Sequence, residues 1–207
     1  MDEERQGPEP SDLELVQRAR SGDDAALGAL AKRHHAAAYR VALGFVHEDD
    51  VAQDVVQDAF VKAFRALGGF RADASFRTWL LTITANEAKG ALRRTGRRRE
   101  TALEEAAEVR SEEGGPAHDA IMRQEAARAR SMLEQLPEKQ RMSVTLRVEE
   151  GLSFKEIGEV IGSSEGAARV NYFHGIRRLR ELMDVGTESQ DGGPGIGRSG
   201  DPKESAK

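Results

Sequence analysis

The chain has 207 residues and a formal net charge of −5, and it contains no cysteine. The missing cysteines exclude a disulfide framework and a thiolate metal site. No stretch approaches the roughly 18 apolar residues of a membrane span, and the acidic start MDEERQGPEP is unlike a signal peptide, so we expect a soluble cytoplasmic protein.

The charge is unevenly distributed. Residues 11–100 carry +3 and residues 137–185 are neutral, whereas residues 101–136 carry −4. A basic run such as Arg93 to Arg99 acts over a Debye length of roughly 8 Å, so it can attract phosphate whatever the total charge is. The competing interpretation of that run is a solvated helix end.

The first half of the chain predicts only helices. Residues 1–10 are expected to be disordered, Ser11 can cap a first helix, and a break at residues 21–23 precedes a second. Residues 47–70 follow with apolar positions spaced three and four apart, which predicts one buried stripe. These positions are Ala52, Val55, Val56, Ala59, Phe60, Ala63, Phe64 and Leu67. The opposite face carries Asp54, Gln57, Asp58, Val61 and Arg65.

Gly68 and Gly69 end this helix, and a loop leads to another helix that starts near Ser75, which completes a four-helix unit over roughly 11–95. Aromatic side chains in and after the loop alternate with cations, an arrangement suited to stacking unpaired nucleic-acid bases. The aromatic residues are Phe70, Phe76 and Trp79, and the cations are Arg71, Arg77 and Lys89. The alternative is that Phe76 and Trp79 are core residues of a helix start, and this alternative fits each of the two better when it is taken singly.

Residues 101–116 have few large apolar groups and predict a flexible linker. Structure is expected to resume at residue 117 with an amphipathic helix, followed by a helix over 138–150 that Gly151 stops. Residues 186–207 predict a disordered tail. The fold class is therefore all-α, with two small helical domains at 11–100 and 117–185. The adjacent His34 and His35 point about 100° apart on a helix, so we assign them no metal site.

The stretch SFKEIGEVIGSSEGAARVNYFHGIRRLRE predicts two helices joined by a Gly-Ser-Ser turn. We expect Ile157, Val160 and Ile161 of the first helix to pack against the second through Ala167, Val170, Phe173 and Leu179. Small residues at 166–168 would let the second helix enter a major groove, leaving Arg169, Asn171 and His174 to reach bases or phosphates. Arg177, Arg178 and Arg180 suit the DNA backbone. The alternative is an ordinary helical hairpin with solvated arginines.

Two stretches, DVVQDAFVKAFRALGGFRADASFRTWLLTITANEAKGALRR and LPEKQRMSVTLRVEEGLSFKEIGEVIGSSEGAARVNYFHGIRRLREL, resemble the second and fourth regions of bacterial extracytoplasmic-function sigma factors. This resemblance implies a non-enzymatic initiation factor with core RNA polymerase, promoter DNA and an anti-sigma factor as partners, without cofactor or membrane insertion. It also implies a regulon for stress or envelope signals.

The resemblance implies three sets of site residues. Polymerase would be bound by Asp54, Gln57, Asp58 and Arg65. The minus-ten strand would be bound by Phe70, Arg71, Asp73, Ser75, Phe76, Arg77, Thr78, Trp79, Asn86 and Lys89. The minus-thirty-five duplex would be bound by Ser163, Ser164, Arg169, Asn171, Phe173, His174, Arg177 and Arg178. The chain departs from the family pattern at Arg169-Val170-Asn171 and at Ile176, where further cations are common.

Two other function classes are weighed against this one. A response-type regulator would need an α/β receiver domain, yet residues 11–100 show no strand pattern. An all-helical enzyme would need a nucleophile with a base, paired carboxylates or a phosphate-binding Gly loop, and the sequence offers none of these patterns.

Overall fold

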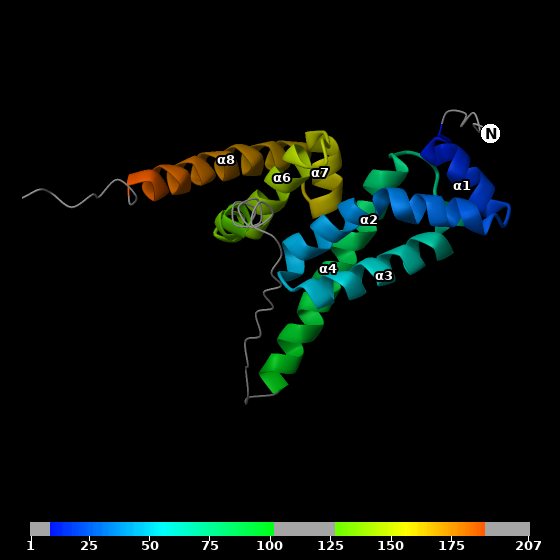
Figure 1. Cartoon of the computed structure of the whole chain (residues 1–207), viewed down its shortest axis with the longest axis horizontal. Helices are drawn as coiled ribbons and strands as arrows, with labels where there is room; N and C mark the ends of the chain where they lie inside the picture. Colours follow the sequence, from blue (N-terminus) through cyan, green and yellow to red (C-terminus); the bar gives the residue numbers. More distant parts are fainter. Residues whose placement is uncertain (1–8, 102–126, 189–207) are drawn as a thin grey trace, which may run out of the picture.

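The computed structural model describes residues 9–101 and 127–188, and all regular structure within these ranges is helical (Figure 1). The all-α expectation is confirmed, and the described residues contain no strand of the kind that a receiver domain would require. Most of the predicted linker and tail lie outside the described residues, as do residues 1–8. The predicted tail starts too early, because the last helix extends to Glu188.

The first unit consists of α1 (Asp12–Arg20), α2 (Asp24–Val46), α3 (Asp49–Arg65), the short 3₁₀ helix η1 (Leu67–Gly69) and α4 (Phe76–Thr101). Ser11 caps α1 as predicted: its Oγ accepts from the Glu14 amide at 3.3 Å, and the Glu14 carboxylate accepts from the Ser11 amide at 2.7 Å. Such a reciprocal box satisfies two otherwise unpaired amides. Asp23 caps α2 by accepting from two amides.

Helix α3 buries the predicted apolar stripe against α2 and α4. Ala52, Ala59 and Ala63 have no exposed surface, while Phe64 is half-buried. Alanine at these positions lets the helix axes approach closely, and the larger Val55, Val56 and Phe60 fill the space between them. The core of this unit therefore takes up one face of α3 and leaves the opposite face exposed to solvent.

The second unit consists of α6 (Glu138–Val148), α7 (Phe154–Ile161) and α8 (Glu165–Glu188), and residues 127–134 are also helical. Ser153 and Glu156 form a second reciprocal capping box at the start of α7. Gly162 ends α7 with φ 70°, a left-handed conformation in which a side chain would be strained. The turn is tight: a Cβ on Gly158 would lie 2.8 Å from the Ser163 carbonyl oxygen.

The prediction of which face of α8 packs against α7 is wrong. Val170 and Phe173 are 54% and 58% exposed, and Ala167 is exposed as well. Ala168 is fully buried instead, and Gly175 approaches α6 so closely that a Cβ there would lie 2.7 Å from a Val144 methyl group. Residues four and seven positions after Ala168 share its side of a helix. The hairpin crossing turns this side, rather than the more apolar one, toward α6 and α7.

The two units lie against each other. In Figure 1, α6 and α7 contact the middle of the first unit at α2 and α4, while the far ends of α4 and α8 project away in different directions. The Met142 sulfur rests where Gly44 lacks a side chain, since a Cβ on Gly44 would lie 2.8 Å from it. Apolar residues of both units form one continuous core. Among the described helices, none combines the length and hydropathy needed to cross a bilayer.

Candidate nucleic-acid and polymerase interfaces

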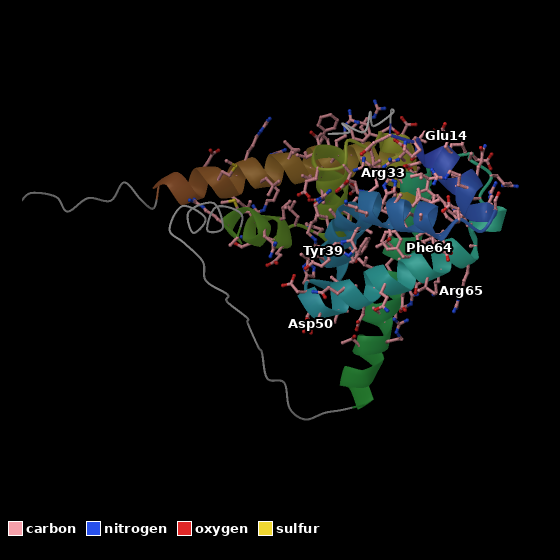
Figure 2. All side chains as sticks on the ribbon, turned by 45° about the vertical axis from the view of Figure 1, so that its right-hand side comes forward. Glu14, Arg33, Tyr39, Asp50, Phe64 and Arg65 are labelled. Carbon is pink, nitrogen blue, oxygen red and sulfur yellow. The ribbon has the colours of Figure 1, made fainter. Side chains whose placement is uncertain are left out.

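The outer face of α3 is exposed and mostly polar, with Val61 as an exposed apolar residue. Asp54, Gln57, Asp58 and Arg65 all lie on it, as predicted. In Figure 2, Arg65 points outward from α3 and Asp50 marks the other end of the same helix. Asp54 lines two adjoining surface hollows, one of which contains Phe60 and Gln57, while the other contains Asp58 and Arg94. None of the four predicted residues is needed to fill the core, so this row is available to a partner.

The loop between η1 and α4 is held by the first helix. The Arg20 guanidinium donates to the Leu67 carbonyl at 2.9 and 3.1 Å and also to the Phe70 carbonyl. Phe70 and Phe76 are 7% and 3% exposed, and their rings meet edge to face at 5.9 Å. Trp79, half-buried, lies 5.1 Å from Phe70 between ring centroids. In this conformation the three rings form a packed floor beneath the loop, so Phe76 is a core residue as the alternative expects, Trp79 is one in part, and Phe70 joins them.

Polar groups of the same set lie above that floor. Arg71 and Asp73 are exposed and pair with each other at 3.2 Å. Ser75 caps α4, because its Oγ accepts from the Thr78 amide at 3.0 Å. Asn86 lies further along α4, and its side chain is exposed. A hollow beside the loop is lined by Phe70, Asp73 and Ser75 and also by the start of α7.

Three residues predicted to bind DNA are instead engaged by the second unit. Arg77 donates to the Glu150 carboxylate and, at 2.8 Å, to its backbone carbonyl. Thr78 is completely buried, and its Oγ1 donates to the Glu156 carboxylate at 2.9 Å. Lys89 donates to the Ile161 carbonyl at 3.1 Å, and burial lowers the pKa of its ammonium group. These contacts join positions more than 70 residues apart.

Helix α8 exposes most of the residues predicted for duplex recognition. Phe173, His174, Arg177 and Arg178 are exposed, whereas Asn171 is half-buried. Ser164 acts as a cap, with its Oγ accepting from the Ala167 amide at 3.2 Å. The Arg169 side chain is exposed, and two contacts limit its orientation. It pairs with Glu165 at 3.0 Å, and its guanidinium carbon lies 5.1 Å from the centre of the Phe154 ring.

Several contacts escaped the sequence analysis. His34 is 5% exposed, and its Nε2 lies 2.8 Å from the Asp12 carboxylate, so this histidine joins α1 to α2. Burial lowers the pKa of His34, although Asp12 opposes the shift. The spacing of Ser153 and Glu156 is typical of a capping box, but no local pattern indicates the partners of Asp12 or Glu150. No cluster of three or more His, Asp or Glu side chains within the described ranges could hold a metal ion.

Comparison with known proteins accounts for both units. Residues 30–98 match Sigma-70 region 2, and residues 126–179 match Sigma-70 region 4. The chain is 37% identical over 182 residues to the ECF RNA polymerase sigma-E factor of Escherichia coli, covering 84% of this chain and 93% of the relative. The chain belongs to the extracytoplasmic-function sigma factors. It is therefore a factor for transcription initiation, which pairs with RNA polymerase and recognises promoters.

Other relatives agree with this assignment. The sigma factor is 38% identical over 181 residues to the RNA polymerase sigma-H factor of Pseudomonas aeruginosa, with 84% of this chain and 92% of the relative covered. Its fold is similar to that of CnrH, solved in complex with the cytosolic domain of CnrY, with a TM-score of 0.62 and 29% identity. That match covers 83% of this chain and 96% of the solved chain.

Proposed function

We propose that the sigma factor binds core RNA polymerase through the outer face of α3, with Asp54, Gln57, Asp58 and Arg65 as contacts. The observation that carries this assignment is the division of α3 into an apolar face that is buried except at the half-buried Phe64 and an exposed face that is mostly polar. Charged residues that contribute nothing to the core are suited to a charged partner surface, where complementarity favours fast and specific association.

Replacing Asp54 and Asp58 with lysine tests this docking face. We expect the double variant to keep its helicity and to compete for core polymerase about tenfold less well, which corresponds to about 1.4 kcal/mol. The matched control replaces the exposed Glu134 and Glu159 of the second unit with lysine, because the change in net charge is the same. Equal competition by both double variants would remove the assignment.

The loop from Phe70 to Thr78, together with Trp79, Asn86 and Lys89, is proposed to hold the melted minus-ten strand. Support comes from the rigid attachment of the loop by Arg20 and from the exposed polar groups above the aromatic floor. Capture of an extruded base has to offset a few kcal/mol of lost stacking. Exposed Arg71, Asp73 and Ser75 can provide hydrogen bonds to a base edge, and Trp79 can provide a ring face.

Helix α8 is proposed to read the minus-thirty-five duplex from the major groove. Arg169 can bond a guanine because its pairing with Glu165 and the Phe154 ring limits its orientations. Ser163, Ser164, Asn171, Phe173 and His174 complete the groove face, while Arg177 and Arg178 contact phosphates. In such an arrangement, base contacts carry the specificity and phosphate contacts fix the position of the helix.

The cellular setting follows from this function. We propose that the sigma factor acts in the cytoplasm without a cofactor and without catalysis of its own, since polymerase performs the chemistry. The family resemblance supports an anti-sigma partner and a regulon for stress or envelope signals, and a solved relative is bound by the cytosolic domain of CnrY. The functional domains are proposed to span residues 11–100 and 117–185.

Transcript mapping after overexpression tests the proposed function. New transcription start sites that share one upstream motif are expected, and an unchanged set of transcripts would contradict the proposal.

A further inference from the structure

We propose that Glu165 is a specificity-determining residue for the minus-thirty-five duplex, where it accepts a hydrogen bond from the amino group of a cytosine next to the guanine that Arg169 binds. This inference rests on the proposed reading of the duplex by α8 and names part of the base sequence that α8 selects. Glu165 is the first residue of α8 and the one acidic residue between Ser164 and Arg180.

Glu165 and Arg169 form an ion pair on the exposed surface of α8, one helical turn apart. The Arg169 Nη2 lies 3.0 Å from the Glu165 Oε1, and the two side chains are 55% and 53% exposed. An acidic side chain on a helix that approaches phosphates would ordinarily be repelled by them. Because the charge of Arg169 offsets that of Glu165, the pair can come close to the duplex as one neutral unit.

The bond between the two side chains leaves hydrogen-bonding groups on both of them for a ligand. A carboxylate has two oxygens with about four lone-pair sites, and a guanidinium has five N–H donors in a fixed fork. The contact joins Oε1 of Glu165 to Nη2 of Arg169, so Oε2 of the glutamate lies outside this bond. The pair therefore offers an acceptor and several donors side by side.

The Phe154 ring supports the pair from α7. The Arg169 guanidinium carbon lies 5.1 Å from the ring centre. The ring is itself held from two other sides, since the Arg147 guanidinium carbon also lies 5.1 Å from its centre and the Tyr172 ring centre lies 5.6 Å away. Arg147 in turn donates to the Leu152 carbonyl at 2.7 Å. Side chains with few alternative orientations lose little entropy on binding, which favours selective contacts.

The start of α8 has few other side chains that could read a base. Gly166 and Ala167 are exposed, and a Cβ on Gly166 would meet no neighbouring atom within 4 Å, so packing does not require glycine there. Ala168 is buried and holds this end of the helix against the second unit. The N-terminal residues of a recognition helix are the ones that contact base edges. Between residues 165 and 169, only Glu165 and Arg169 have long polar side chains for this task.

The chemistry of the pair matches a guanine and a cytosine in neighbouring base pairs. In the major groove, guanine presents the acceptors O6 and N7 to an arginine, and cytosine presents its N4 amino group to a carboxylate. Adenine also has an amino group, but its N7 acceptor would face the carboxylate. Neighbouring base pairs are about 3.4 Å apart along the duplex. This rise is close to the 3.0 Å between the bonded atoms of Glu165 and Arg169.

Selection of promoter duplexes by reconstituted holoenzyme tests this role. The probe is a promoter found by transcript mapping, with its minus-thirty-five region randomised, and the bound duplexes are sequenced. Wild-type sigma factor should select a cytosine beside a guanine. Glu165→Ala should lower the preference for that cytosine about tenfold, as the loss of one base contact does, while the guanine is still selected. Glu165→Gln should change the preferred base at the same position from cytosine to adenine, because an amide bonds both N6 and N7.

Glu181→Gln is the matched control, since Glu181 pairs with Arg177 at 3.2 Å over the same four-residue spacing at the far end of α8. It should leave every base preference unchanged, and circular dichroism should show unchanged helicity in all variants. Unchanged selection by both Glu165 variants, or loss of the guanine preference alone, would overturn the role of Glu165, because a residue that only stabilises the helix or holds Arg169 would give these results. Failure of duplex reading itself would appear separately, as wild-type holoenzyme that selects no upstream sequence.

Discussion

The two units of the sigma factor treat their aromatic residues in opposite ways. In the first unit, Phe70 and Phe76 are almost completely buried beneath the loop proposed to hold single-stranded DNA. In the second unit, Phe173 is 58% exposed on the helix proposed to read duplex DNA. The first unit therefore uses aromatic packing to fix a loop in place, whereas the second leaves apolar surface on a helix that is already rigid. A loop needs a supporting floor, but a recognition helix carries its own backbone hydrogen bonds.

The largest expected effect comes from truncating one aromatic side chain in each unit. Phe76→Ala should lower the free energy of unfolding by about 3–5 kcal/mol, because it empties a buried site. Phe173→Ala should change it by about 0.5 kcal/mol or less, as for other exposed positions, while weakening binding to the upstream duplex. Chemical denaturation and duplex titration measure the two quantities. Equal destabilisation by both variants would contradict the claim that Phe76 is a buried packing residue and Phe173 an exposed binding residue.

A second prediction breaks the second unit while sparing the first. Gly158→Val should destabilise the helix-turn-helix by about 1–3 kcal/mol, since the new side chain meets the backbone of Ser163, Ser164 and Glu165. Gly166→Ala is the control, because no atom outside its own helix lies within 4 Å of the added Cβ. Hydrogen exchange should show faster opening of α7 and α8 with α1 to α3 unchanged. Uniform loss of protection through the whole chain would instead show that the two units unfold together.

The smallest effect concerns acid stability, which should depend on the buried histidine of the first unit. The pKa of His34 is lowered by burial from its ordinary value of 6.5, with Asp12 opposing and Arg77 and Arg33 adding to the shift. The unfolded chain therefore takes up this proton at higher pH than the folded chain. Stability should fall as pH drops below about 6.5, and the loss should end once the folded-state pKa is passed.

His34→Asn removes this group and should flatten the fall in unfolding free energy between about pH 7 and about pH 5.5. A shallower slope is also expected to persist, because burial and Arg141 lower the pKa of His47 as well. His174→Gln, at an exposed position on α8, is the matched control. An unaltered slope in the His34 variant, measured by denaturation over this range, would contradict the assignment.

The local structure was predictable wherever short-range patterns decide it. Ser11 and the apolar spacing of α3 predicted a cap and a buried face that the structure contains. The face of α8 was not predictable by counting apolar residues, because the crossing of the hairpin places Ala168 inward and leaves Phe173 outside. Where two helices approach very closely, small residues such as Gly175 mark the contact better than large apolar ones do.

The contacts between the units depended on information that no local pattern contains. Glu150 follows a helix as an ordinary acidic residue would, and only the packing of α6 and α7 against α2 and α4 makes it a buried partner of Arg40 and Arg77. The same holds for Asp12 and His34, which lie 22 positions apart. The candidate site residues therefore remain predictions, and the bonds that Arg77, Thr78 and Lys89 make to the second unit could not be predicted from the sequence.

The division of labour between the two units is tested most directly by permanganate footprinting of a mapped promoter with reconstituted holoenzyme. Asn86→Ala should reduce reactivity of thymines in the melted region while leaving protection of the upstream duplex intact. Arg169→Ala should weaken upstream protection by the equivalent of about 1–3 kcal/mol, yet support transcription from a template that already contains an open bubble as the wild type does. Parallel loss of melting and upstream protection in both variants would contradict the account.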